Sequence, residues 1–108
     1  MESRVDDPPA GWTNPITASA GSWQRGVDPS KLLPSRGDLL KSRLDFQRAL
    51  ILSGRDRFSP ILATERGVIY DGHHAVRASA EEGRLVDVHV VAELIAARSD
   101  SILSLPVR

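Results

Sequence analysis

The sequence predicts a small α+β domain in which a mixed β-sheet is flanked by helices. Three observations favour this class: a helical pattern over residues 39–52, a hairpin pattern over 61–70, and a strand–turn–helix–turn–strand pattern over 67–91. The 108 residues are enough for one domain with a modest core. The chain has no cysteine, which excludes a disulfide framework, a thiolate metal site and a thiol nucleophile.

Residues 1–26 are expected to form an extended arm or linker, and residues 27–108 the domain. The arm is rich in Pro and Gly, and its apolar residues follow neither the helical nor the strand period. Trp12 and Trp23 favour docking of the arm on the domain, because indole side chains gain much free energy by burial. The domain is expected to begin with a short strand and turn over residues 27–33, which end at Pro34.

The helix over residues 39–52 is expected to stop at Gly54, and Ser35 and Asp38 are candidates for its N-cap. Two adjacent apolar stripes would give it a broad face toward the sheet. The stripes consist of Leu39, Phe46 and Leu50, and of Leu40, Leu44 and Ile51.

A β-hairpin is expected from residues 61–64 and 68–70, and the next helix begins at His73 and ends before Gly83. The strand over residues 86–91 alternates, with three valines on one face. A short helix is expected over residues 92–98. The apolar residues of the last ten positions are candidates to dock on the domain, at a place that the sequence does not define: Ile102, Leu103 and Leu105.

The start of the helix at His73 is the candidate site. A helix start has unpaired N–H groups and a partial positive charge, and the preceding Gly72 lets an anion approach the backbone. Such a site is typical of phosphate binding. Its predicted phosphate-binding residues are Gly72, His73, His74 and Arg77, since His73 and Arg77 share a helix face.

His73, His74 and Asp71 are the candidate catalytic residues. Each histidine has two interpretations: a phosphate ligand or acid/base group, or a polar residue at the start of an exposed helix. Asp71 also has two: a general base or metal anchor, or only a turn and capping residue. Adjacent helical residues point about 100° apart, so no metal site is assigned to the two histidines. The sequence does not identify a cofactor, and a divalent metal is one candidate.

The segment Asp71-Gly-His-His-Ala-Val-Arg-Ala78, between the hairpin and the strand over 86–91, resembles the signature of the ParB/sulfiredoxin superfamily. Residues 27–34 resemble the first strand of that family. Sulfiredoxins carry a catalytic cysteine after the motif glycine, and this chain has none, so redox repair is excluded. Ala75 replaces the usual arginine. The His-His form is most similar to the ParB-like nuclease branch, which is associated with toxins.

This resemblance implies a nuclease or nucleotide-hydrolysing domain that acts on DNA or on a nucleotide, as the C-terminal toxin portion of a larger secreted bacterial effector. Its partners would then be a nucleotide or nucleic acid and a cognate immunity protein, and it would act in the cytoplasm or inside a target cell. The alternative, from another class, is a non-catalytic module that binds a nucleotide or nucleic acid and acts through a partner.

Fourteen basic and fourteen acidic residues leave no net charge, which is unlike a protein that holds duplex DNA through many phosphate contacts. Residues 25–66 are more basic, with nine Lys and Arg against five Asp and Glu. This surplus is interpreted as solvation of a helix and its loops, with a basic binding face as the alternative. No apolar run is long enough to span a bilayer, so no membrane partner is expected.

Overall fold

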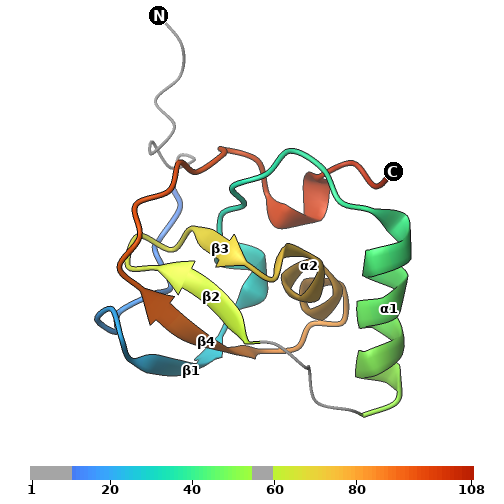
Figure 1. Cartoon of the computed structure of the whole chain (residues 1–108), viewed down its shortest axis with the longest axis horizontal. Helices are drawn as coiled ribbons and strands as arrows, with labels where there is room; N and C mark the ends of the chain where they lie inside the picture. Colours follow the sequence, from blue (N-terminus) through green and yellow to red (C-terminus); the bar gives the residue numbers. More distant parts are fainter. Residues whose placement is uncertain (1–10, 55–59) are drawn as a thin grey trace, which may run out of the picture.

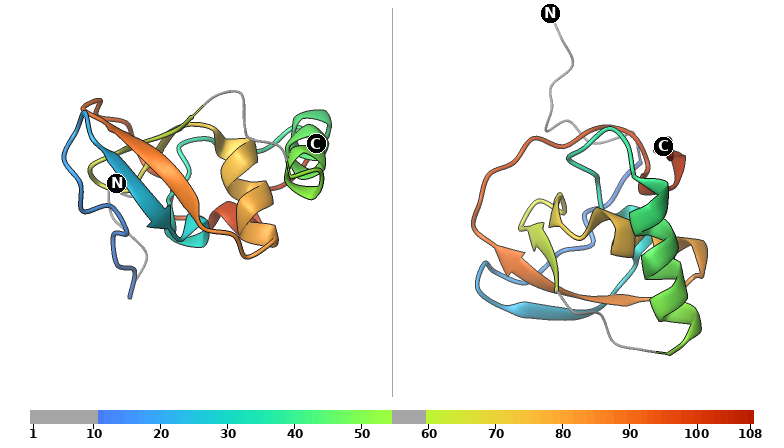
Figure 2. Two further views of the ribbon diagram at one scale, coloured as in Figure 1. Left: turned by 90° about the horizontal axis from the view of Figure 1, so that it is seen from below. Right: turned by 45° about the vertical axis from the view of Figure 1, so that its right-hand side comes forward.

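A four-stranded mixed sheet organises the part of the chain that the computed structural model describes, residues 11–54 and 60–108. Its strands are β1 (Trp23–Val27), β2 (Ile61–Thr64), β3 (Ile69–Asp71) and β4 (Val86–Val91). They lie in the order β1-β4-β2-β3, where β4 is parallel to β2 and the other two pairs are antiparallel. Helix α2 (His73–Glu81) packs against this sheet, and α1 (Lys41–Leu52) packs against α2 (Figures 1 and 2). The predicted α+β class is confirmed.

The main core lies between the sheet and α2. Val86, Val88 and Val90 are buried on one face of β4, while Asp87, His89 and Val91 on the other face are partly exposed. Val76 of α2 is fully buried in the same cluster as these valines and Ile61 of β2. The predicted alternation of this strand is therefore confirmed.

The hairpin and the helix that follows it are also confirmed. β2 and β3 pair through Leu62 and Asp71, and the turn between the strands contains Gly67 at φ 80°. Helix α2 begins at His73, directly after Gly72. It ends before Gly83, which adopts φ 66° and donates its N–H to the carbonyl of Ala80.

Helix α1 differs from the prediction in its start and in its apolar face. It begins at Lys41, and neither Ser35 nor Asp38 caps it; the N-cap position is Leu40. Within α1 only Leu44 and Leu50 are buried, whereas Phe46 is half exposed. The predicted broad face is wrong because α1 meets α2 rather than the sheet, and a helix–helix contact needs a narrower stripe.

The short strand and turn predicted over residues 27–33 are placed too late in the sequence: β1 ends at Val27, and the turn is a 3-10 helix, η1 (Pro29–Lys31). The carboxylate of Asp28 caps η1 by accepting from the N–H of Ser30. The boundary expected after residue 26 thus falls inside β1. Of the arm, residues 11–26 are described, and Ile16 is buried in the main core.

Trp12 docks on the domain as expected. Its indole N–H donates to the carbonyl of Lys31 at 2.7 Å, and its ring packs against a small cluster formed by Leu33, Val68 and Ala97. Trp23 behaves differently, since it is 56% exposed on β1 and meets the ring of His89 edge-on. Docking is therefore confirmed for Trp12 alone.

The helix predicted over residues 92–98 is wrong, because this segment is extended. Ile95 and Ala97 both pack in the cluster under Trp12, and this spacing of two residues is the period of an extended chain. Arg98 donates its N–H to the carbonyl of Pro34. Beyond it, a 3-10 helix, η2 (Ile102–Ser104), buries Ile102 against α2. The last residues run beside the start of α1 (Figure 1), with Leu39 and Val107 forming a β-bridge.

We predict that Leu44→Ala lowers the free energy of unfolding by about 2 to 4 kcal/mol, because it opens a cavity between α1 and α2. The matched control is Leu52→Ala in the same helix, whose side chain is 78% exposed and which should change stability by less than about 0.5 kcal/mol. Urea unfolding measures both. Equal effects would show that α1 faces the other way.

We predict that Trp12→Ala destabilises the domain by about 1 to 3 kcal/mol, because it removes buried apolar area and one hydrogen bond. Trp23→Ala should cost about 1 kcal/mol or less, since that ring is mostly solvated. Thermal unfolding of the two variants distinguishes the sites. A larger loss for Trp23→Ala would contradict the docked position of Trp12.

Candidate functional site

A pocket of about 480 Å³ lies at the start of α2, between the end of β3 and helix α1. It is lined by Arg36 from the loop before α1, by Ser42, Arg43, Phe46 and Gln47 of α1, by Pro60, and by Asp71, Gly72, His73, His74 and Ala75. Four of the five residues predicted for the site therefore share one cavity, as expected for consecutive residues at a strand–helix junction. The fifth, Arg77, does not line it.

Gly72 makes this junction. Its φ of 97° is in the left-handed region, and a Cβ atom there would lie 3.3 Å from the Cα atom of Ile61 in β2. The helix has no side-chain N-cap, and among residues 11–54 and 60–108 the N–H groups of His73, His74 and Ala75 have no hydrogen-bond partner. The residues that carry these donors line the pocket, at the positive end of a helix dipole.

His73 is buried, at 7% exposure, and is tied to the loop before α1. Its Nε2 atom accepts the N–H of Ser35 at 3.0 Å, and the hydroxyl of Ser35, at 3.2 Å from the same atom, donates to the carbonyl of Ile69. Burial lowers the pKa of His73 to about 4, and the positive charge of Arg36 acts in the same direction. The ring is therefore neutral at pH 7, with its proton on Nδ1.

His74 makes the equivalent contact at the other end of the same loop. Its Nε2 atom accepts the N–H of Leu40, the N-cap residue of α1, at 3.0 Å. Burial lowers the pKa of His74, and the charges of Arg36 and Arg43 lower it further, against a weaker opposing effect of Asp38. Both histidines thus serve as neutral acceptors for backbone groups, and neither is an exposed start of a helix.

Arg77 is held away from the pocket. Its Nε atom donates to the carboxylate of Glu81 at 2.8 Å, and one of its terminal nitrogens donates to the carbonyls of Ile102 and Leu105. The guanidinium group of Arg77 is therefore bound by α2 and by the C-terminal segment. The same carboxylate of Glu81 binds Arg48, so this cluster links α1, α2 and the end of the chain.

Two arginines that the sequence did not indicate supply the positive charge of the pocket. Arg36 makes one long contact, 3.4 Å, with Asp38. Arg43 is exposed and has no ion-pair partner among the described residues. No local motif marks either residue, because they reach the site only through the packing of α1 on α2.

Asp71 ends β3 and is exposed at the edge of the pocket. One carboxylate oxygen accepts the N–H of Gly72 at 3.0 Å, as predicted for a turn residue, but Asp71 does not cap α2, because the N-cap position is Gly72 and no side chain caps it. The other oxygen has no hydrogen-bond partner in residues 11–54 and 60–108. In that part of the chain, no group of three or more His, Cys, Asp or Glu residues is placed to hold a metal ion.

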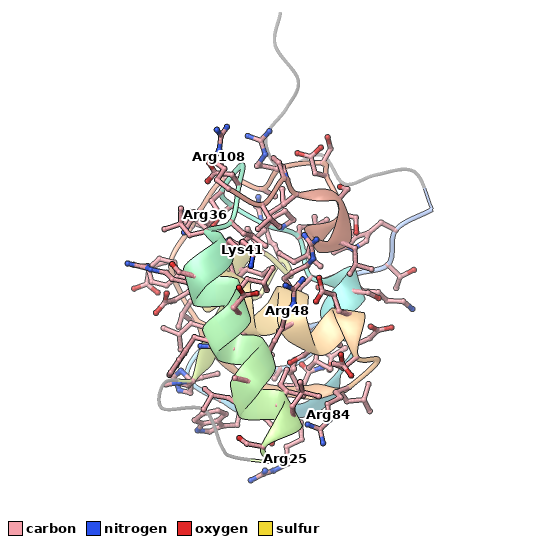
Figure 3. All side chains as sticks on the ribbon, turned by 90° about the vertical axis from the view of Figure 1, so that its right-hand side faces the viewer. Arg25, Arg36, Lys41, Arg48, Arg84 and Arg108 are labelled. Atoms are coloured by element: carbon pink, nitrogen blue, oxygen red, sulfur yellow. The ribbon has the colours of Figure 1, made fainter. Side chains whose placement is uncertain are left out.

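The face formed by α1 carries many basic side chains, most of them in ion pairs. Figure 3 shows Arg36, Lys41 and Arg48 at the helix, together with Arg84, Arg108 and Arg25 from other parts of the chain. Arg25 pairs with Asp87, Lys41 and Arg48 pair with Asp45, and Arg108 pairs with Asp38. These acids neutralise much of the charge. In the described residues, Arg43 beside the pocket and Arg84, which contacts the carbonyl of Ile51, are the labelled or lining arginines without an ion pair.

No family model, curated protein or solved structure matches the chain, so the resemblance to the ParB/sulfiredoxin superfamily stays a prediction. In the described residues, no helix combines the length and the apolar character that crossing a bilayer requires.

We predict that acid destabilises the domain through His73. Between the unfolded pKa of 6.5 and the folded value of about 4, the unfolded chain binds a proton that the folded chain does not. The free energy of unfolding should therefore fall by about 3 kcal/mol from this residue as the pH drops from about 7 to below 4.

The matched variant is His73→Gln, which keeps a hydrogen-bond acceptor but does not titrate. Urea unfolding at a series of pH values should give it a shallower loss of stability than the wild type, with the difference confined to this window. Parallel pH profiles for the two proteins would contradict the burial of a neutral His73.

Proposed function

We propose that this chain is a ParB-like domain that binds a phosphate-bearing ligand of nucleotide size at the start of α2. One observation carries the proposal. Around one pocket lie three backbone N–H groups at the start of α2 and one cation, Arg43, for which residues 11–54 and 60–108 provide no hydrogen-bond or ion-pair partner. Backbone donors at a helix start and arginine side chains both commonly bind phosphate in proteins.

The size and charge of the pocket favour a small ligand over a long polyanion. Its volume of about 480 Å³ is within the usual range for small-molecule sites. The chain has no net charge, and the basic residues along α1 are largely paired with acids. Few phosphates of a duplex could therefore be neutralised, and affinity for duplex DNA depends on that number.

Binding without catalysis is the better supported of the two functions. The Nε2 atoms of His73 and His74 are both engaged by backbone N–H groups, and burial keeps both rings neutral. The acceptor nitrogen of each ring is therefore occupied, and the lowered pKa of both rings makes them poor proton acceptors at neutral pH. This arrangement favours the non-catalytic module.

Hydrolysis of a phosphate ester is the second candidate, and Asp71 is the observation in its favour. Its carboxylate is exposed at the pocket edge, with one oxygen free of hydrogen bonds in the described residues. A carboxylate beside bound phosphate can act as a general base for an attacking water. Titration of nucleotides and short oligonucleotides, with product analysis with and without Mg²⁺, separates the two functions: turnover identifies the hydrolase, and saturation without products identifies the binding module.

We predict that Arg43→Ala weakens nucleotide binding about tenfold to hundredfold, because it removes a charge-assisted hydrogen bond to the phosphate. Arg84→Ala is the control with the same change of charge. That residue contacts the carbonyl of Ile51 near the far end of α1 and does not line the pocket.

Calorimetric titration of both variants at fixed salt gives the comparison. Equal losses in affinity would mean that only the overall charge matters, and unchanged binding by Arg43→Ala would place the ligand elsewhere.

A further inference from the structure

The loop of residues 35–40, which we call the Arg36 loop, is attached to α2 at both of its ends. The N–H of Ser35 donates to Nε2 of His73, and the N–H of Leu40 donates to Nε2 of His74, each at 3.0 Å. The two acceptors are adjacent in sequence, and their divergent directions on the helix let them reach opposite ends of one loop. The two imidazole rings thus act as a two-point clamp.

This clamp exists only while both rings are neutral. A neutral imidazole has one donor and one acceptor nitrogen, whereas an imidazolium ion has two donors and cannot accept the N–H of Ser35 or Leu40. Protonation would place two donors face to face in a buried setting. The clamp would then open at the protonated ring.

The clamp positions the two cations of the pocket. Arg36 is the second residue of the Arg36 loop, and Leu40 is the N-cap of the helix that carries Arg43. Other contacts also hold this region, since Leu39 exchanges backbone hydrogen bonds with Pro106 and Arg108. These hold the end of the loop beside the C-terminal segment. The contacts with His73 and His74 fix it relative to α2 and its free N–H groups.

We propose that His73 and His74 are positioning residues, which hold Arg36 and Arg43 over the anion site by accepting backbone hydrogen bonds as neutral rings. This inference rests on the proposed function. It differs from the direct interpretation of two histidines at a phosphate site, in which cationic rings bind the anion or transfer a proton.

The charged groups around the rings come from each element packed against them. Arg36 and Asp71 face His73, with His74 beside it, and Arg36, Arg43 and Asp38 face His74. The nearby guanidinium groups favour neutral rings, and the carboxylates oppose them. A bound anion would also favour protonation, so the clamp and a direct ligand role predict opposite responses to acid.

The first experiment measures sulfate affinity by NMR titration, because sulfate keeps its charge between pH 7.5 and 4. At pH 7.5, His73→Gln and His74→Gln should bind within about twofold of the wild type, since glutamine can accept the same hydrogen bond. His73→Ala and His74→Ala should bind about tenfold more weakly, as expected for the loss of a buried hydrogen bond. His89→Gln is the matched control, because His89 contacts Trp23 on the sheet and should leave binding unchanged.

The two roles of the histidines predict opposite changes of sulfate affinity on acidification. For the wild type, sulfate affinity should fall as the pH approaches about 4, where His73 takes up a proton, while the double Gln variant keeps a level affinity over the same range. Affinity that rises on acidification, or Gln variants as weak as the Ala variants, would overturn the positioning role in favour of cationic ligands.

A second measurement does not depend on any ligand. Hydrogen exchange should show the amides of Ser35 and Leu40 to be protected in the wild type, with each losing about tenfold in protection in the corresponding His→Ala variant. If the wild type binds neither sulfate nor nucleotides, the proposed function fails, while this pattern would still support the clamp. Fast exchange of both amides in the wild type would overturn the clamp whatever the binding result.

Discussion

The close contact between Gly72 and β2 is the constraint on which the rest of the structure depends. With φ at 97° and no Cβ atom, this residue lets α2 begin immediately after β3 and directly against Ile61. Any side chain would be strained by that φ and would press on the central strand. Because α2 starts so close to the sheet, His73 and His74 fall in the interior, and the free end of the helix opens into a pocket.

Burial of two polar rings at this place needs partners, and the partners are backbone groups of the Arg36 loop. The N–H groups of Ser35 and Leu40 would otherwise lack acceptors in a partly buried region, which costs about as much as a lost hydrogen bond. The same contact explains why α1 has no side-chain cap. Its first donors are satisfied from a distance, by His74 and by the carbonyl of Arg108.

Local sequence patterns predicted the hairpin, α2 and β4 because each is specified by neighbouring residues: turn glycines, a stop at Gly83 and alternating valines. Predictions from local patterns failed where contacts between distant parts of the chain determine the secondary structure. Residues 92–98 are extended because they pack on the cluster under Trp12, and α1 starts late because its caps come from α2 and the chain end. The same distinction applies to the site. Its four consecutive residues, 71–74, were predicted from the local sequence, whereas Arg36 and Arg43 line the pocket only because of tertiary packing. Arg77 was predicted to bind the ligand, but it is held by Glu81 outside the pocket.

The distribution of charge around the pocket follows from this packing. Two guanidinium groups and a helix dipole already place positive charge at one point, and protonated histidines would add repulsion in a region of low dielectric constant. Neutral rings avoid that repulsion and supply the acceptors that the loop requires. Arg77 is neutralised by Glu81 and is held against the C-terminal segment. The positive charge left over therefore belongs to Arg43, Arg36 and the first turn of α2, and an anion in the pocket is what would balance it.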